Sequence, residues 1–145
     1  MALAAKIDGL AYNVYVLLGD GEMQEGSVWE AVMSAGHRKT DNLVAIVDNN
    51  KVAQDNLTAD LKVIEPLDKK FESFGWHVIK IDGHNIPQII DALEEANNTK
   101  GKPTVIIAET IKGKGVSFME GNKAWHGKAP SEELLNKALE EIRNA

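Results

Sequence analysis

The sequence predicts an α/β protein built on an open parallel sheet with helices on both of its faces. Short apolar runs of strand length alternate with amphipathic segments of helical spacing along the chain. The first apolar run is continuous, which suits a strand covered on both faces, whereas residues 76–81 alternate enough to be half covered. With 145 residues, the chain has the length of one domain with one core, and we expect right-handed crossovers between its strands.

The first predicted βαβ unit begins with a strand at 12–18, an apolar run that ends at Gly19. A helix is expected at 25–39, with acidic residues near its start and basic residues at its end, as the helix dipole favours. A second strand follows at 43–47. The apolar stripe of the helix at 25–39 consists of Val28, Ala31, Val32 and Ala35.

The remaining elements are two strands and three helices. The first of these helices has Pro66 in its first turn and ends before Gly75, whereas Asn85 and Ser131 are the expected N-caps of the other two. The last two helices each carry apolar residues at helical spacing on one face. The strands are expected at 76–81 and 104–108, and the helices at 66–74, 86–97 and from 132 onward.

Two segments have no sustained period. Residues 51–66 are polar with scattered apolar positions, so we expect an irregular surface loop near the strand ends. Residues 110–130 are rich in glycine, and loops of this length inside compact domains are usually functional or disordered.

The N-terminal residues have the pattern of the last turns of a helix that stops near Gly9. They have neither the basic start nor the long apolar core of a signal peptide. A helix that shows only its last turns indicates further sequence upstream. We therefore expect residues 1–145 to be a single but partial domain.

Composition excludes several classes of function. The net charge of −6 argues against a nucleic-acid partner or an anionic membrane surface. The sequence contains no cysteine, which excludes disulfides and thiolate chemistry and fits a reducing compartment such as the cytoplasm. No apolar run approaches the length of a membrane span.

The residues most suited to binding a ligand lie where the first two strands end. Gly19-Asp20-Gly21 follows the first strand, and Asn50 lies 30 residues after Asp20, just past the second. The carboxyl ends of parallel strands share one edge, where ligands of open sheets bind. Asp20, Asn50 and a main-chain carbonyl such as that of Val52 offer the oxygen ligands that Mg²⁺ prefers. Gly21 allows close approach of a phosphate, and the following helix would add its dipole.

Other interpretations of these turns are weaker. Each turn alone is common in ordinary loops, but their joint placement at consecutive strand ends favours a site. A dinucleotide fingerprint fails because Gln24 stands where its third glycine is required. A P-loop fails because the spacing from Gly121 to Gly127 is one residue too long, and Lys128 is followed by Ala129.

The paired motifs resemble the signature of thiamine diphosphate enzymes. The sequence around these motifs resembles transketolases: GDGEMQEGSVWEAVMSAGHRKTDNLVAIVDNNK. Residues 111–115 and 125–127 also resemble transketolases. The likeness runs from Met1 to about Pro130 and best matches the later half of the diphosphate-binding domain. In some members this domain is a separate N-terminal subunit.

The resemblance implies a role for each matching residue. Asp20, Asn50 and the Val52 carbonyl would hold Mg²⁺, and His126 would approach both the diphosphate and the reacting carbons. Glu25 would lie near the subunit interface that couples the cofactors, and the 111–115 loop would close over the cofactor. The residues implied to bind thiamine diphosphate are Gly19, Asp20, Gly21, Glu22, Asn50 and His126, and the catalytic pair is His126 and Glu25.

The resemblance also implies partners. The family's turn that meets the aminopyrimidine lies upstream of the matched region, and its activating glutamate lies in another domain. The leading hypothesis is therefore a transketolase component that transfers two-carbon ketol units between sugar phosphates within a homo- or hetero-oligomer. A C-terminal transketolase subunit or further domains would complete it.

Two alternatives remain open. The chain is either a truncated fold without activity of its own, or part of another thiamine diphosphate enzyme. Deoxyxylulose-phosphate synthase and 2-oxo acid dehydrogenase are the candidates for the latter, although residues 24–26 and 29–31 favour transketolase. The remaining histidines are expected to be structural or surface residues: His37, His77 and His84. Lys112 and Lys114 would either neutralise phosphate charge or be solvated.

Overall fold

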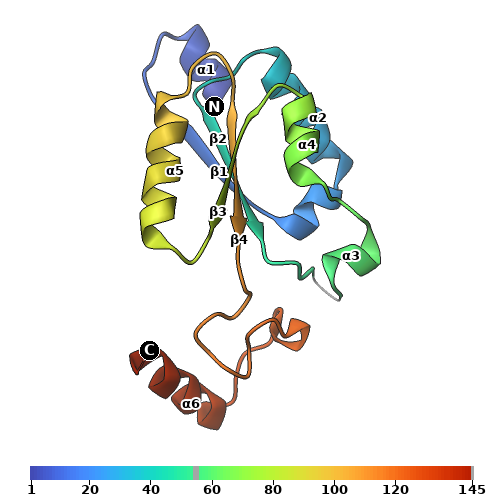
Figure 1. Cartoon of the computed structure of the whole chain (residues 1–145), viewed down its shortest axis with the longest axis vertical. Coiled ribbons are helices and arrows are strands. Elements are labelled where there is room, and N and C mark those ends of the chain that lie inside the picture. The colour runs from blue at the N-terminus through green and yellow to red at the C-terminus, as the bar shows by residue number, and fades with distance from the viewer. Residues whose placement is uncertain (54–55, 145) are drawn as a thin grey trace.

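The computed structural model describes residues 1–53 and 56–144, and it confirms the predicted α/β class. Four parallel strands alternate with helices in the described part of the chain (Figure 1). The strands are β1 (Val14–Gly19), β2 (Leu43–Asn49), β3 (His77–Asp82) and β4 (Thr104–Glu109). The helices are α1 (Ala2–Ile7), η1 (Asp20–Gln24), α2 (Gly26–His37), α3 (Thr58–Leu61), α4 (Leu67–Ser73), α5 (Ile86–Asn98), η2 (Lys123–Trp125) and α6 (Glu132–Arg143), where η marks a 3₁₀ helix.

The strand order is β1-β2-β4-β3, so the last strand in sequence lies inside the sheet. The register aligns the carboxyl ends of the strands: Gly19 pairs with Asp48, and Asp48 pairs with Ala108. In a parallel sheet this alignment places the residues that follow each strand along one edge. The C-terminal part of the chain lies beyond that edge (Figure 1).

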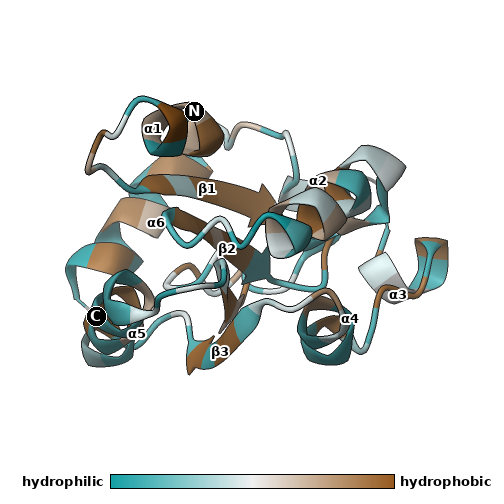
Figure 2. Ribbon diagram, turned by 90° about the horizontal axis from the view of Figure 1, so that it is seen from above, coloured by the Kyte–Doolittle hydropathy of each residue, from teal (hydrophilic) through white to brown (hydrophobic). Residues whose placement is uncertain are grey.

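Helices cover both faces of the sheet (Figure 2). On one face, α2 and α4 pack over β2 and β4 around Phe71, which is fully buried and meets Trp76 edge-on at 5.3 Å between ring centroids. On the other face, Ala92 and Ala96 of α5 pack against Val44 and other strand residues. Such burial of apolar area is the main favourable term that holds the layers together.

A close approach joins α2 to the end of α4. A Cβ placed on Gly36 would lie 1.9 Å from the carbonyl oxygen of Phe74, which no side chain tolerates. Beside this contact, the indole N–H of Trp76 donates to the carbonyl of Val32 at 2.9 Å. Glycine at position 36 therefore allows the two helices to pack against the same face of the sheet.

Coverage of both faces, expected for the continuous apolar run of the first strand, is wrong for β1. Residues 104–108 of β4 are all buried, whereas Leu17 of β1 is 70% exposed and Tyr15 is 46% exposed. The cause is position: β1 ends the strand order, and α5 packs on strands β2, β3 and β4. The side chains of Tyr15 and Leu17 lie on the α5 face, beside the helix rather than beneath it.

Element boundaries differ from expectation in the turns. The strand predicted from residue 12 begins at Val14, and the helix predicted from residue 25 begins at Gly26 after a separate 3₁₀ helix, η1. The segment expected to be an irregular loop contains α3 and an antiparallel bridge between Val52 and Leu57. Gln54 and Asp55 of that predicted loop lie outside the described residues.

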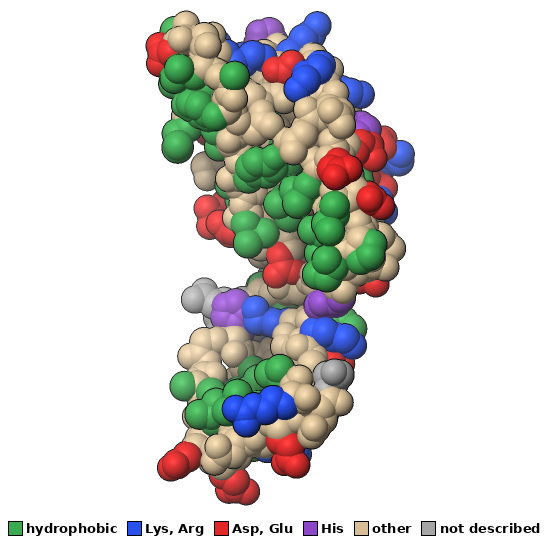
Figure 3. All heavy atoms as spheres, turned by 90° about the vertical axis from the view of Figure 1, so that its left-hand side faces the viewer, with side chains coloured by type: hydrophobic (Ala, Val, Ile, Leu, Met, Phe, Trp, Pro, Cys, Tyr) green, Lys and Arg blue, Asp and Glu red, His purple; other side chains and the backbone are tan. Residues whose placement is uncertain are grey.

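Residues 110–144 form a smaller unit beyond the strand ends (Figure 3). Trp125 and Phe118 meet edge-on at 5.4 Å, and the indole N–H of Trp125 donates to the Phe118 carbonyl at 3.0 Å. The hydroxyl of Ser117 donates to Glu141 of α6 at 2.8 Å. The long glycine-rich segment is thus tied to the last helix, and Lys123 reaches back to donate to Asn56 at 2.9 Å.

Smaller expectations for three side chains, those of Asn85, Ser131 and His37, are confirmed. The side chain of Asn85 accepts a hydrogen bond from the Gln88 N–H, and that of Ser131 accepts one from the Leu134 N–H, as N-caps do. His37, expected to be a structural or surface residue, is exposed at the last position of α2. None of the helices in the described ranges has the length and apolar character needed to cross a membrane.

Candidate cofactor and metal site

A cleft of about 510 Å³ opens where β1 and β2 end. Turns after both strands, the start of η1 and the C-terminal segment form its walls. Histidine and lysine side chains gather at the narrow junction between the two parts of the molecule (Figure 3). All eight residues singled out from the sequence line this one cleft: Gly19, Asp20, Gly21, Glu22, Glu25, Asn50, Val52 and His126.

Asp20 is the most buried polar residue of the cleft, with 1% of its surface exposed. Its Oδ2 accepts two hydrogen bonds, from the Lys51 N–H at 2.8 Å and from the Thr58 hydroxyl at 2.7 Å. Among the residues that the structure describes, none donates to its Oδ1. A buried polar atom left without a partner costs about 1–3 kcal/mol, so this oxygen is suited to a ligand that compensates the cost.

Asn50 lies in the turn directly after β2. Its Oδ1 accepts the Val52 N–H at 2.9 Å, and its Nδ2 donates to Oδ2 of Asp48 at 3.0 Å. Lys51, between Asn50 and Val52, has a φ of 65°, in the left-handed region that residues with side chains rarely adopt. The turn therefore brings the Asn50 amide oxygen and the Val52 main chain to the cleft that Asp20 lines.

These residues fit a hard divalent cation. The unpartnered carboxylate oxygen of Asp20, the amide oxygen of Asn50 and the carbonyl of Val52 are oxygen donors of the kind that Mg²⁺ selects. Across the described ranges, no three His, Cys, Asp or Glu side chains gather as a possible metal site. A cation here would accordingly depend on amide and main-chain oxygens beside one carboxylate.

The Gly19-Asp20-Gly21 turn is stabilised internally, because the Gly19 N–H donates to Oε2 of Glu22 at 2.8 Å. A Cβ on Gly21 would lie 3.4 Å from the Cβ of Ala53, so the glycine leaves this wall of the cleft open. The turn runs into the short η1, and α2, the helix expected to add its dipole here, begins at Gly26.

The two residues expected to be catalytic lie at the rim. Glu25 is exposed between η1 and α2, and His126 is exposed directly after η2. Lys112 enters the same cleft from the segment that follows β4. The structure thus brings a histidine and a lysine from the C-terminal unit to the turns after β1 and β2.

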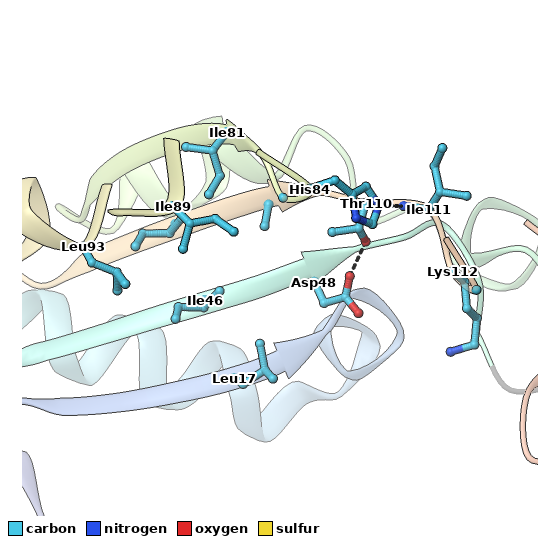
Figure 4. A pocket seen from close by; sticks show the side chains of 14 residues that line it. Leu17, Ile46, Asp48, Ile81, His84, Ile89, Leu93, Thr110, Ile111 and Lys112 are labelled. Carbon is cyan, nitrogen blue, oxygen red and sulfur yellow. Dashed lines mark hydrogen bonds between the residues drawn. The ribbon is translucent and has the colours of Figure 1, made fainter. Parts of the chain in front are cut away.

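A second cavity of about 390 Å³ lies between α5 and the sheet (Figure 4). Apolar side chains form most of its wall, including Leu17, Ile46 and Ile89. Its polar end holds Thr110, whose hydroxyl donates to Oδ1 of Asp48, as the dashed line in Figure 4 shows. Asp48 and Lys112 also line the first cleft, so the two spaces adjoin.

His77 and His84, predicted to be structural or surface residues, have partners in the fold. His77 contacts the carboxylate of Glu95 at 2.6 Å. Nε2 of His84 accepts the Ile111 N–H at 2.8 Å, which attaches the segment after β4 to the turn after β3.

An ion-pair cluster supports the turn after β2. Lys51 Nζ lies 2.9 Å from Glu65 and 3.5 Å from Glu109. Burial alone would raise the pKa of Glu65, but hydrogen bonds from the Leu67 N–H and from Lys51 hold it below its usual value. The pKa of Lys51 is raised, because its carboxylate partners outweigh partial burial.

Sequence reasoning missed four residues that shape this site: Lys51, Thr58, Asp48 and Thr110. Asp48 carries a weak signal, because it immediately precedes the Asn-Asn pair at a strand end. Thr58 carries none, since it lies in a segment without periodicity and contacts Asp20 across 38 residues of chain. Thr110 is distinguished in the sequence only as the start of the glycine-rich segment.

Comparisons with known proteins give one family. The family model described as "Transketolase, thiamine diphosphate binding domain" matches residues 5–142. The chain is 46% identical over 142 residues to the 6-deoxy-6-sulfo-D-fructose transketolase subunit SqwG of Clostridium sp. (strain MSTE9), covering 98% of this chain and 52% of that protein. It is 45% identical over 144 residues to an apulose-4-phosphate transketolase subunit of Actinobacillus succinogenes, covering 99% and 52%.

A solved structure agrees with the sequence matches. The transketolase of Campylobacter jejuni superposes with a TM-score of 0.91 at 35% identity, over 98% of this chain and 23% of that one. Compared with the two curated transketolase subunits, the chain spans about half of their length.

Proposed function

Because the chain belongs to the family of transketolase thiamine diphosphate-binding domains, we propose that it forms the diphosphate- and metal-binding part of a transketolase. The reaction would be transfer of a two-carbon ketol unit between sugar phosphates. Bound thiamine diphosphate supplies the carbanion chemistry of such a transfer, and the protein binds and orients it.

One observation carries the metal part of the proposal: Asp20 is buried in the cleft with Oδ1 unpartnered by any described residue. Asp20, Asn50 and the Val52 carbonyl would hold Mg²⁺, which keeps near-octahedral oxygen coordination and commonly bridges to phosphate. The Gly21 turn would accept the diphosphate, because its wall is free of side-chain atoms where a Cβ would otherwise stand.

The rim residues would act on the phosphate and the substrate. Lys112 would neutralise diphosphate charge, since a lysine ammonium acts as a point charge toward phosphate. His126 would contact the diphosphate side of the cofactor and hold a proton near the reacting carbons, while Glu25 would lie at a subunit contact. Each of these side chains lines the cleft.

Partners and substrates are part of the proposal. The two curated relatives are named as transketolase subunits, and their names point to a sulfo-sugar and a sugar phosphate as substrates. We infer a ketose of this general kind as donor, and a second chain or further domains that complete the site. The names of these relatives favour transketolase over the other thiamine enzymes considered from the sequence.

The proposal is tested by titrating the chain with thiamine diphosphate at fixed Mg²⁺ while following tryptophan fluorescence. Trp125 directly precedes His126, which lines the cleft, and serves as the reporter. We expect saturable binding that requires Mg²⁺ and is abolished in Asp20→Asn. Asp91→Asn, on the exposed face of α5, is the matched control and should bind as the wild type does. Binding that ignores both the metal and the Asp20 substitution would refute the site.

A further inference from the structure

Among the residues that the structure describes, Thr58 makes the one side-chain hydrogen bond to Asp20, although 38 residues separate them. The threonine is 3% exposed, and its hydroxyl donates to Oδ2 of Asp20 at 2.7 Å. Its main-chain N–H donates to the Lys51 carbonyl at 3.0 Å, and the Lys51 N–H donates back to the same Oδ2 at 2.8 Å. Three hydrogen bonds therefore join Asp20, Lys51 and Thr58 in a closed ring.

The ring treats the two carboxylate oxygens of Asp20 unequally. Both donors go to Oδ2, while within the described ranges Oδ1 receives none. Two donors on one oxygen stop the carboxylate from rotating about its terminal bond, which is otherwise a soft torsion. The Thr58 hydroxyl, together with the Lys51 N–H, thus determines which oxygen remains available.

Thr58 is itself held in place through its main-chain carbonyl. The side-chain amide of Gln24 donates to the carbonyl of Thr58 at 3.0 Å and to that of Lys62 at 2.9 Å. Thr58 is the first residue of α3, and Lys62 is its C-cap. The ammonium of Lys62 donates back to the Gln24 carbonyl at 3.2 Å. Because η1 runs from Asp20 to Gln24, the same short helix carries the carboxylate and the anchor of its partner.

We propose that Thr58 is a positioning residue for a divalent cation, whose hydroxyl fixes Oδ2 of Asp20 so that Oδ1 is presented to the metal. This inference rests on the proposed Mg²⁺ site at Asp20. Hydrogen bonds to ligating carboxylates orient them, and loss of such a partner typically lowers metal affinity by about 10–100-fold. Orientation matters most for Mg²⁺, which requires near-ideal octahedral geometry, and less for Ca²⁺, which accepts flexible coordination.

The test replaces the hydroxyl and keeps the shape. Thr58→Val removes the donor at nearly constant volume, and Thr58→Ser keeps the donor. Thr99→Val, at the end of α5, is the matched control because its hydroxyl donates within its own helix, to the Glu95 carbonyl. Mg²⁺ and Ca²⁺ are each titrated into the chain at a fixed excess of thiamine diphosphate, with binding read from tryptophan fluorescence.

We expect Thr58→Val to lower the Mg²⁺ affinity by about tenfold or more, and to lower the Ca²⁺ affinity less. Thr58→Ser should bind both ions within about twofold of the wild type, and Thr99→Val should be unchanged. If the valine variant does not fold, Thr58→Cys, whose thiol is a weak donor, must show the same larger loss for Mg²⁺ than for Ca²⁺.

Two kinds of failure are distinguishable. A wild-type chain that binds neither ion, or binds them unaltered in Asp20→Asn, refutes the proposed metal site itself. A chain whose Mg²⁺ binding needs Asp20 but is unchanged in Thr58→Val overturns the positioning role alone. Equal losses in Thr58→Val and Thr58→Ser, or equal losses for both ions, also overturn it, because they indicate packing rather than the hydrogen bond.

Discussion

Asn50 donates its side-chain N–H to Oδ2 of Asp48 at 3.0 Å, and this contact determines which end of the Asn50 amide faces the Val52 N–H. Asp48 is in turn held through its other oxygen by the Thr110 hydroxyl. The contact between Asp48 and Thr110 links the end of β2 to the segment after β4. The orientation of a proposed metal ligand thus depends on a carboxylate that does not need to contact the metal.

Asp48→Ala should therefore weaken cation binding without removing a ligand. Without Asp48, the Asn50 amide is free to turn its nitrogen toward the cleft, and we expect about a tenfold loss in Mg²⁺ affinity. Isothermal titration of Mg²⁺ at a fixed excess of thiamine diphosphate measures this loss. Asp8→Ala, at the exposed end of α1, is the control. Unchanged affinity in Asp48→Ala would show that the amide is oriented by the Val52 contact alone.

Gly36→Ala should destabilise the fold although alanine is the better helix former. The added Cβ would lie 1.9 Å from the Phe74 carbonyl oxygen, so α2 must shift away from the end of α4, at a cost of about 1–3 kcal/mol. Urea unfolding followed by circular dichroism gives the difference.

Gly26→Ala supplies the comparison for this substitution within the same helix. Among the described atoms, nothing lies within 4 Å of the Cβ that it would add, so the free energy of unfolding should stay equal or rise slightly. The close approach of α2 to α4 would be contradicted if both variants changed stability to the same extent.

Glu65→Gln should reduce the loss of stability in acid. The pKa of Glu65 is lowered in the fold: partial burial opposes the shift, and hydrogen bonds from the Leu67 N–H and Lys51 outweigh it. A lowered pKa stabilises the fold above the unfolded-state value of about 4.3, and this contribution is lost as the pH falls through the folded-state value. Because the side chain is half exposed, the contribution should be below about 1 kcal/mol.

Thermal midpoints measured between about pH 7 and about pH 3 test this dependence. The wild type should lose more stability than Glu65→Gln as the pH falls below about 4.5, whereas Glu94→Gln, on the exposed side of α5, should follow the wild type. Parallel curves for the wild type and Glu65→Gln would show that the ion pair with Lys51 contributes nothing to the fold.

The sequence was most informative where structure is local. Apolar periodicity located the four strands and the longer helices, and consecutive parallel strands necessarily bring Asp20 and Asn50 to one edge. The exposure of Leu17 was not predictable, because it depends on strand order and on where α5 packs. Thr58 was not predictable either, since its contact with Asp20 exists only after residues 38 apart in sequence have folded together.

Lys112 should strengthen cofactor binding through charge alone. It lines the cleft from the segment after β4, and hydrogen bonds to charged groups contribute about 1.5–3 kcal/mol, so Lys112→Ala should weaken thiamine diphosphate binding roughly tenfold. The loss should shrink as salt is raised, because screening weakens exposed charge interactions. Lys102→Ala removes an exposed charge from the loop before β4 and should leave binding unchanged at every salt concentration. Equal losses in the two variants would assign the effect to net charge, and a loss in Lys112→Ala that is independent of salt would assign it to the packing of the 111–115 loop.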